Sequence, residues 1–96
     1  MPIVEYQGKK YDTGFEFETL QEQVSGIMWQ CMEYSDMKNV SREEIEELDE
    51  IWERTRSIKN NYALMDSLEK LFETQQYLDD LREELNKRFG GRDAHV

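Results

Sequence analysis

The chain contains little cysteine and histidine, and this shortage excludes several kinds of site. Cys31 is the only cysteine among 96 residues, so neither an internal disulfide nor a cysteine-based zinc site can form. Its neighbours Ile27, Met28 and Met32 favour a buried structural thiol over a reactive one. His95, the only histidine, lies near the C-terminus, so no serine has a histidine base and no Glu-x-x-His metal pair occurs.

Loops that bind phosphates or calcium are also missing. The sequence has no glycine-rich phosphate motif, and the acidic pairs Asp79-Asp80 and Glu83-Glu84 lack the glycine and the spacing of a calcium loop. Carboxylates alone would need a cleft that raises one pKa, and short helical bundles seldom provide one. We therefore expect no catalytic residue, no cofactor and no metal, and we predict that the protein is not an enzyme.

Long apolar runs are absent as well. No stretch approaches the roughly 20 apolar residues that a helix needs to span a bilayer. The N-terminus has no cationic segment followed by an apolar one, as a secretory signal would. We therefore predict no membrane association and a cytoplasmic location.

Basic residues are scarce relative to acidic ones. Lysine and arginine total 12 against 22 aspartates and glutamates, which gives a formal net charge of −10. Such a surface repels phosphate backbones and anionic lipids, so direct binding to nucleic acid or to a membrane is not expected. It favours encounter with a protein partner that has a basic surface, although solubility alone also explains a high net charge.

The chain is long enough for one domain, which we place at residues 1–91. Two tryptophans, five tyrosines and four phenylalanines are more large buriable groups than a disordered chain carries. Ninety-six residues leave no room for a second core. Gly90-Gly91 ends the last predicted helix, and residues 92–96 are predicted to form a flexible tail.

Residues 1–12 are predicted to form a short β-hairpin. A two-residue turn at Gln7-Gly8 pairs Tyr6 with Lys9 and Val4 with Tyr11. Val4, Tyr6 and Tyr11 then share one face, and this face needs a surface to pack on because an isolated hairpin is only marginally stable.

A first helix is predicted over residues 16–35. Two capping signals compete for its start, one formed by Thr13 with Glu16 and the other by Thr19 with Glu22. Apolar residues at steps of three and four give the helix one buried face, made of Phe17, Leu20, Val24, Ile27, Met28 and Cys31.

The clearest local signal predicts a second helix over residues 42–58. Ser41 and Glu44 have the spacing of a capping box, in which each side chain bonds the backbone N–H of the other residue. Val40 and Ile45 occupy the two positions of a hydrophobic staple.

A third helix is predicted over residues 62–89, where leucines recur at heptad steps and Gln75 and Arg82 fill the polar gaps. The second and third apolar stripes differ in phase by roughly 200° on a continuous helix, which favours a break at residues 59–61 with Asn61 as the next N-cap. An unbroken heptad row through Ile58 and Tyr62 keeps a single long helix open as the alternative.

These elements predict a mainly α fold, in which a short N-terminal β-hairpin precedes a three-helix bundle. In the alternative fold, the first helix packs on one long helix spanning Ser41–Phe89. Such a helix would be about 73 Å long, so it would need a second chain to cover its overhang, as a dimer or higher oligomer.

The main candidate site is an acidic run at the start of the second helix. Carboxylates four residues apart repel each other on a helix, so this run opposes helix stability beyond the first turn. Glu43, Glu47 and Glu50 fall on one row that we expect to be exposed. The residues that we assign to partner binding from this run are Glu43, Glu46, Glu47, Asp49, Glu50 and Glu53.

Two tryptophans complete the predicted partner-binding set. Trp29 and Trp52 lie off or at the edge of the main apolar stripes, and tryptophan is enriched at interface hot spots. Met28 and Met32 flank Trp29 with adaptable side chains that are common at binding surfaces. Packing within a monomeric bundle explains the same residues without a partner.

These observations favour a non-catalytic protein that binds and occludes a protein partner. In size and charge the chain resembles small acidic proteins of phages and mobile elements that block host enzymes. This resemblance implies an inhibitor, an antitoxin-like protein or an anti-defence factor, and the acidic row suggests nucleic-acid mimicry.

Two other functions stay open. The first is a structural homo-oligomer that self-associates through Leu64–Phe89. The second is a nucleotide binder or sponge, with a pocket between protomers and Lys9, Lys10, Arg54 and Arg56 as its cations.

Overall fold

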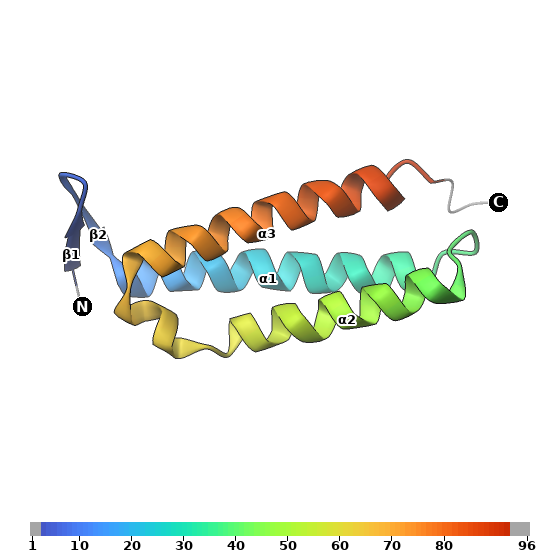
Figure 1. Cartoon of the computed structure of the whole chain (residues 1–96), viewed down its shortest axis with the longest axis horizontal. Helices are drawn as coiled ribbons and strands as arrows, with labels where there is room; N and C mark the ends of the chain where they lie inside the picture. The colour runs from blue at the N-terminus through green and yellow to red at the C-terminus, as the bar shows by residue number, and fades with distance from the viewer. Residues whose placement is uncertain (1–2, 93–96) are drawn as a thin grey trace.

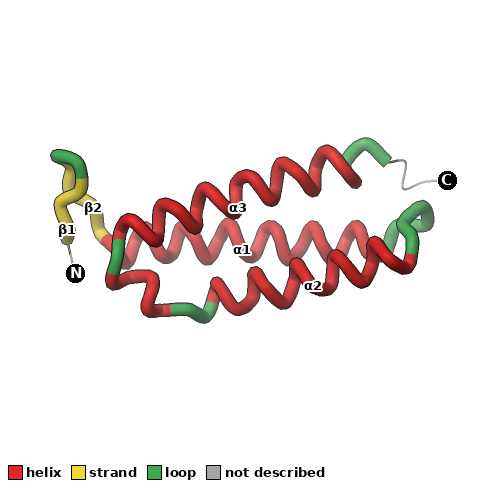
Figure 2. The backbone as a smooth tube through the Cα atoms, in the orientation of Figure 1, coloured by secondary structure: helices red, strands yellow, loops and turns green. Residues whose placement is uncertain are grey.

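A two-stranded hairpin leads into three helices in the computed structural model, which describes residues 3–92 (Figures 1 and 2). The predicted fold class is therefore confirmed. The elements in chain order are β1 (Ile3–Tyr6), β2 (Lys9–Asp12), α1 (Thr13–Ser35), α2 (Arg42–Lys59), the 3₁₀ helix η1 (Tyr62–Asp66) and α3 (Leu68–Phe89).

The hairpin has the predicted register, with Tyr6 opposite Lys9 and Val4 opposite Tyr11. Gln7 and Gly8 both have positive φ angles, 51° and 80°, as a tight turn matched to the strand twist requires. The rings of Tyr6 and Tyr11 lie 5.5 and 5.0 Å from the ring of Phe72 in α3. These two tyrosines thus hold the hairpin against the end of the bundle.

The first helix begins three residues earlier than predicted, at Thr13, and neither predicted capping signal starts it. Asp12 is the N-cap, and its carboxylate accepts hydrogen bonds from the backbone N–H groups of Gly14 (2.9 Å) and Phe15 (3.3 Å). Aspartate satisfies these free N–H groups as well as threonine does. Because Asp12 also ends β2, the hairpin passes directly into α1 without a loop.

The capping box at the start of α2 forms as predicted. The Ser41 hydroxyl accepts from the Glu44 N–H at 3.1 Å, and the Glu44 carboxylate accepts from the Ser41 N–H at 3.0 Å.

The chain breaks between α2 and α3, so the break predicted from the apolar stripes is confirmed and the alternative of one long helix from Ser41 to Phe89 is wrong. The predicted third helix is also corrected, because residues 62–66 form η1 and α3 begins at Leu68. Asn61 makes no side-chain capping bond, whereas the Ser67 hydroxyl accepts from the Lys70 N–H at 3.3 Å. Heptad spacing could not separate the two helix types, since Leu64 is buried in the 3₁₀ turn as it would be in an α-helix.

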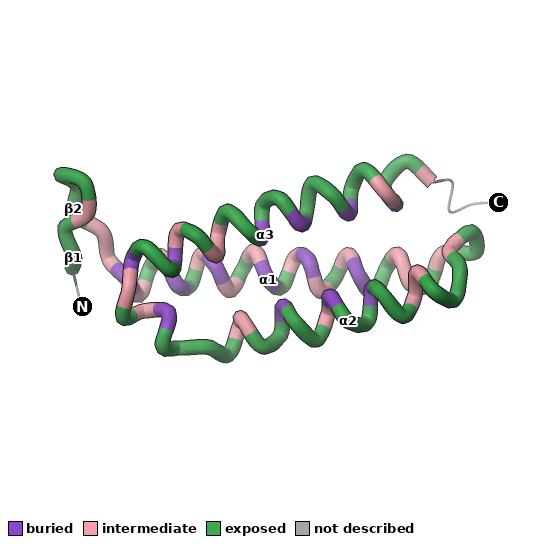
Figure 3. Tube along the Cα trace, viewed as in Figure 1, coloured by how far each residue is buried: buried purple, intermediate pink, exposed green. Residues whose placement is uncertain are grey.

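The core lies along α1, which runs between α2 and α3 and packs on both (Figures 1 and 3). Buried residues occupy one stripe on each helix and face the neighbouring helices. The buried hydrophobic residues are Phe17, Leu20, Val24, Ile27, Cys31, Leu48, Ile51, Leu64, Leu68, Leu71, Leu78, Leu81, Leu85 and Phe89.

Polar side chains bond across the seam between α1 and α3. The Gln75 amide donates to the Glu16 carbonyl at 3.1 Å, and the Gln23 amide donates to the Asp79 carboxylate at 2.7 Å. Gln75 therefore fills its gap in the leucine stripe with a bond to α1, whereas Arg82 is exposed. Directional bonds of this kind fix one register of the two helices.

The predicted flexible tail needs a correction at its first residue. Arg92 folds back, and its guanidinium donates to the Asn39 carbonyl at 3.0 Å and lies 4.7 Å from the centre of the Phe89 ring. The rest of the predicted tail, with His95, lies outside the described residues.

Candidate functional site

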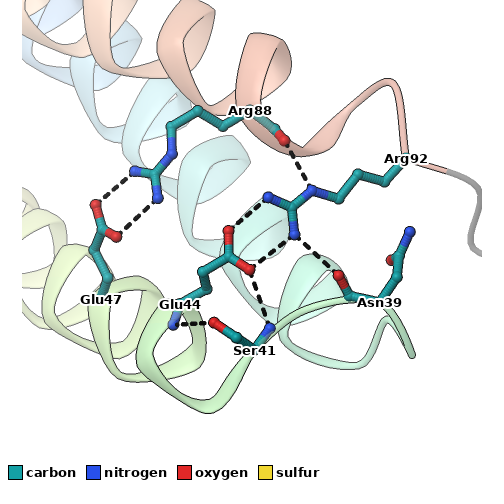
Figure 4. A network of polar contacts seen from close by, with 6 residues as sticks. All are labelled: Asn39, Ser41, Glu44, Glu47, Arg88 and Arg92. Atoms are coloured by element: carbon teal, nitrogen blue, oxygen red, sulfur yellow. Dashed lines mark hydrogen bonds and ion pairs between the residues drawn. The ribbon is translucent and has the colours of Figure 1, made fainter.

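Two arginines, one in the last turn of α3 and one just after it, neutralise part of the acidic run (Figure 4). Arg92 forms a bidentate ion pair with Glu44, at 2.9 and 2.5 Å, on the same carboxylate that completes the capping box. The hydrogen bond from Arg92 and the backbone bond from Ser41 lower the pKa of Glu44 to about 2. Glu44 therefore stays charged under almost all conditions, and its role is structural.

Glu47 is neutralised in the same way, so the expected exposed row of Glu43, Glu47 and Glu50 is incomplete. Arg88 donates two parallel bonds to Glu47, at 2.5 and 2.8 Å. This hydrogen bonding lowers the pKa of Glu47 and raises that of Arg88. Among the predicted partner-binding acids, Glu47 is the one whose charge is most satisfied inside the chain.

The remaining acids form what we call the anionic face, made of Glu43, Glu46, Asp49, Glu50 and Glu53. All five side chains are exposed. The one ion pair that the described residues supply to them joins Glu46 to Arg42 at 4.0 Å, between side chains that are 72% and 94% exposed. At 3.6 residues per turn these acids occupy the side of α2 away from its buried residues Leu48 and Thr55. The face is thus an exposed strip of charge that the chain itself barely compensates.

The two tryptophans occupy different places. Trp29 lies on the outer side of α1 and is 62% exposed, and its indole N–H donates to Glu33 at 2.8 Å. Trp52 is half-buried in α2, with the guanidinium of Arg56 5.5 Å from its ring centre. Met32, which is 53% exposed, lies one helical turn from Trp29 and also lines a pocket with Trp52. Met32 therefore lines the pocket beside Trp52 and lies three residues from Trp29 along α1.

That pocket, which we call the Trp52 pocket, lies between α1 and α2 and has a volume of about 200 Å³. Sequence reasoning missed it, because it depends on how two helices meet. One member of the anionic face, Asp49, lines it together with a second carboxylate from the end of α1, that of Asp36. Its lining residues are Cys31, Met32, Ser35, Asp36, Asp49 and Trp52.

Cys31 forms the buried floor of this pocket. Burial, together with the negative charge of Asp49, raises the pKa of the thiol to about 11. The thiol is therefore protonated and unreactive at neutral pH, which agrees with a structural role.

The cations considered for nucleotide binding are spread over the fold. Lys9 and Lys10 lie on β2, whereas Arg54 donates to the Tyr77 hydroxyl at 3.3 Å and Arg56 lies over Trp52. Residues two apart on a helix do not face each other, so Arg54 and Arg56 diverge.

Within residues 3–92, no group of three or more histidine, cysteine or acidic side chains is placed to hold a metal ion. No helix in the same range is long and apolar enough to cross a membrane. Comparison with family models, with curated proteins and with solved structures finds no match to this chain.

Proposed function

We propose that the protein is a non-catalytic binding protein that places its anionic face on the basic surface of a protein partner and occludes that surface. The observation that carries this proposal is the uneven use of cations along α2. Arginines satisfy Glu44 and Glu47 with bidentate pairs, whereas Glu43, Asp49, Glu50 and Glu53 have no ion-pair partner among the described residues.

Uncompensated charge of this kind has a cost within the monomer. Like charges at i and i+4, such as Glu46 with Glu50 and Asp49 with Glu53, destabilise an isolated helix by about 0.2–0.5 kcal/mol per pair. A basic partner removes this repulsion and is drawn in by the field of the whole chain, whose net charge is −10. The arrangement is therefore unfavourable alone and favourable in a complex.

The spacing of the face fits a partner that normally binds a polyanion. Carboxylates three and four residues apart on a helix lie about 5–6 Å from each other, which gives a regular row of negative charges. Such a row imitates a run of phosphates and competes for a nucleic-acid-binding cleft. Under this proposal, the protein would act as an inhibitor, an antitoxin-like protein or a phage anti-defence factor that works by mimicry.

Charge steers association, but anchoring needs apolar contact. Met32 and the half-buried Trp52 provide this contact where α1 meets α2, and the exposed Trp29 adds to it on the outer side of α1. Exposed aromatic and methionine side chains are typical of interface centres, and rim charges add specificity and speed.

The test compares two double charge reversals of equal size. Glu46→Lys with Glu50→Lys changes the anionic face, and Glu18→Lys with Glu22→Lys changes an exposed pair of the same spacing on α1. The unmodified protein and the two double variants are each added to basic DNA-binding proteins of the native host. Each of these DNA-binding proteins carries a bound fluorescent duplex. We expect the unmodified protein to release the duplex of at least one of them.

The α2 variant should release that duplex about tenfold less well, because exposed charge contacts contribute up to about 1 kcal/mol each and reversal converts attraction into repulsion. The α1 variant should stay within about twofold of the parent. Equal losses in the two variants, or release that is the same at low and high salt, would contradict a specific role for the anionic face.

The homo-oligomer has less support, because the leucine stripe of α3 is already buried inside one chain. Leu78 and Leu85 have almost no exposed surface. Self-association through this stripe would require the bundle to open. Light scattering at micromolar concentration measures the oligomeric state directly.

A further inference from the structure

We propose that the Trp52 pocket accepts an arginine side chain, which the basic partner inserts between α1 and α2. This inference rests on the proposed function, since it names the chemical group by which such a partner is recognised. The pocket would recognise one side chain of the partner at short range, whereas the anionic face attracts the partner at long range.

The shape of the pocket suits a guanidinium group with part of its stem. Met32, Trp52 and the buried Cys31 provide apolar walls for the methylene groups. An engineered cavity of about 150 Å³ holds a benzene ring, so a pocket of about 200 Å³ has room for a planar group of similar size.

The charge of the pocket also suits a cation. Asp36 and Asp49 come from different helices, and no ion pair or side-chain hydrogen bond engages either carboxylate among the described residues. Asp36 is also the C-cap of α1, where the helix dipole adds negative potential. Arg56 lies over the Trp52 ring but does not line the pocket.

Arginine fits this combination better than lysine does. Its planar group donates to two carboxylates at once and stacks on an indole ring, and it loses less hydration on burial than an ammonium group. A lysine side chain would pair with the carboxylates but would not stack on the indole ring of Trp52.

The inference is tested by NMR titration of the full chain with N-acetyl-arginine amide. N-acetyl-lysine amide and N-acetyl-citrulline amide serve as the cationic and the neutral comparisons. We expect saturable shifts at the Trp52 indole N–H and at the amides of Cys31 and Asp49 with the arginine derivative, and weaker ones with the other two. The indole signals are assigned with the Trp29→Phe variant.

A matched pair of variants controls for total charge. Asp49→Asn should weaken arginine binding about two- to fivefold, as expected for an exposed charge pair. Asp80→Asn, which removes the same charge from an exposed position on α3, should leave the affinity unchanged. Trp52→Phe should weaken binding too, and far-UV circular dichroism checks that each variant is folded.

Equal shifts with the citrulline derivative, or equal losses of affinity in Asp49→Asn and Asp80→Asn, would overturn the proposal that this pocket binds a cation. Equal affinity for the lysine derivative would overturn its assignment to arginine. The titration uses no protein partner, so its failure leaves the role of the anionic face intact. Failure of the duplex-release test leaves a positive titration equally intact.

Discussion

The Arg88–Glu47 ion pair allows a quantitative test of how α3 holds the acidic start of α2. The geometry is bidentate, but the two side chains are 31% and 46% exposed, so solvent screens the attraction. We therefore expect a coupling energy of about 1 kcal/mol, at the upper end of the range for exposed pairs. In a chain of this size that corresponds to about 4–8 °C in melting temperature.

The two single variants should differ in their effect. Arg88→Gln leaves the Glu47 carboxylate unpaired beside Glu44, whose charge already acts on it. Glu47→Gln removes the repulsion together with the pair. We therefore expect Arg88→Gln to destabilise the protein by about 1 kcal/mol and Glu47→Gln to destabilise it much less.

Urea denaturation of both single variants and the double variant gives the coupling as a double-mutant cycle. Lys87 and Glu83 provide the control, because they form a more exposed pair within α3, at 3.5 Å. Their coupling should not exceed about 0.5 kcal/mol. If the Arg88–Glu47 coupling is no larger than the control, the arginines do not hold α2 and the reasoning fails.

Three further outcomes follow from the core and from the pKa values. Leu20→Ala, at a position with no exposed surface, should lower the free energy of unfolding by about 2–5 kcal/mol in urea denaturation. The pKa of Glu44 is about 2 in the folded chain against an ordinary 4.5, so its stabilising effect is complete above pH 4.5 and is lost as the pH falls towards 2. Stability should therefore depend less steeply on pH in that window in Glu44→Gln than in the parent, as measured by chemical denaturation at several pH values. Cys31, with its raised pKa of about 11, should react with a thiol reagent at pH 8 far more slowly in the folded chain than in urea, and equal rates would contradict its burial.

Local signals in the sequence predicted much of the fold. The register of the hairpin followed from a two-residue turn, and the start of α2 followed from Ser41 and Glu44, because each depends on residues only a few positions apart. The break before α3 followed from the phase of the apolar stripes. These features are determined by neighbours along the chain.

The helix starts that needed correction lie where several residues compete for the N-cap position. Asp12 caps α1 although Thr13 and Thr19 carried the stronger motif, because the hairpin register places Asp12 at the strand end. Ser67 rather than Asn61 caps α3, since the packing of Leu64 is satisfied by a 3₁₀ turn. Tertiary packing decided both cases.

The candidate site was predicted in part. The exposure of Glu43 and Glu50 could be predicted from helical periodicity, and their role in binding stays a prediction. The pairing of Glu44 and Glu47 could not, because their partners lie more than forty residues away in the sequence. A signal did exist: in a bundle of three alternating helices, the end of α3 lies at the same end as the start of α2. The Trp52 pocket had no such signal, because its shape depends on the approach of two helices.

The position of these arginines also has a consequence for the order of folding. The helices α1 and α2 are neighbours in the sequence and pack on each other. The arginines that neutralise the start of α2 come from the last turn of α3 and from just beyond it. During synthesis α1 and α2 are made before the two arginines are, so we expect the acidic start of α2 to stay uncompensated until α3 has been made. Arg88 and Arg92 then supply the missing positive charge, so the packing of α3 and the neutralisation of Glu44 and Glu47 occur together.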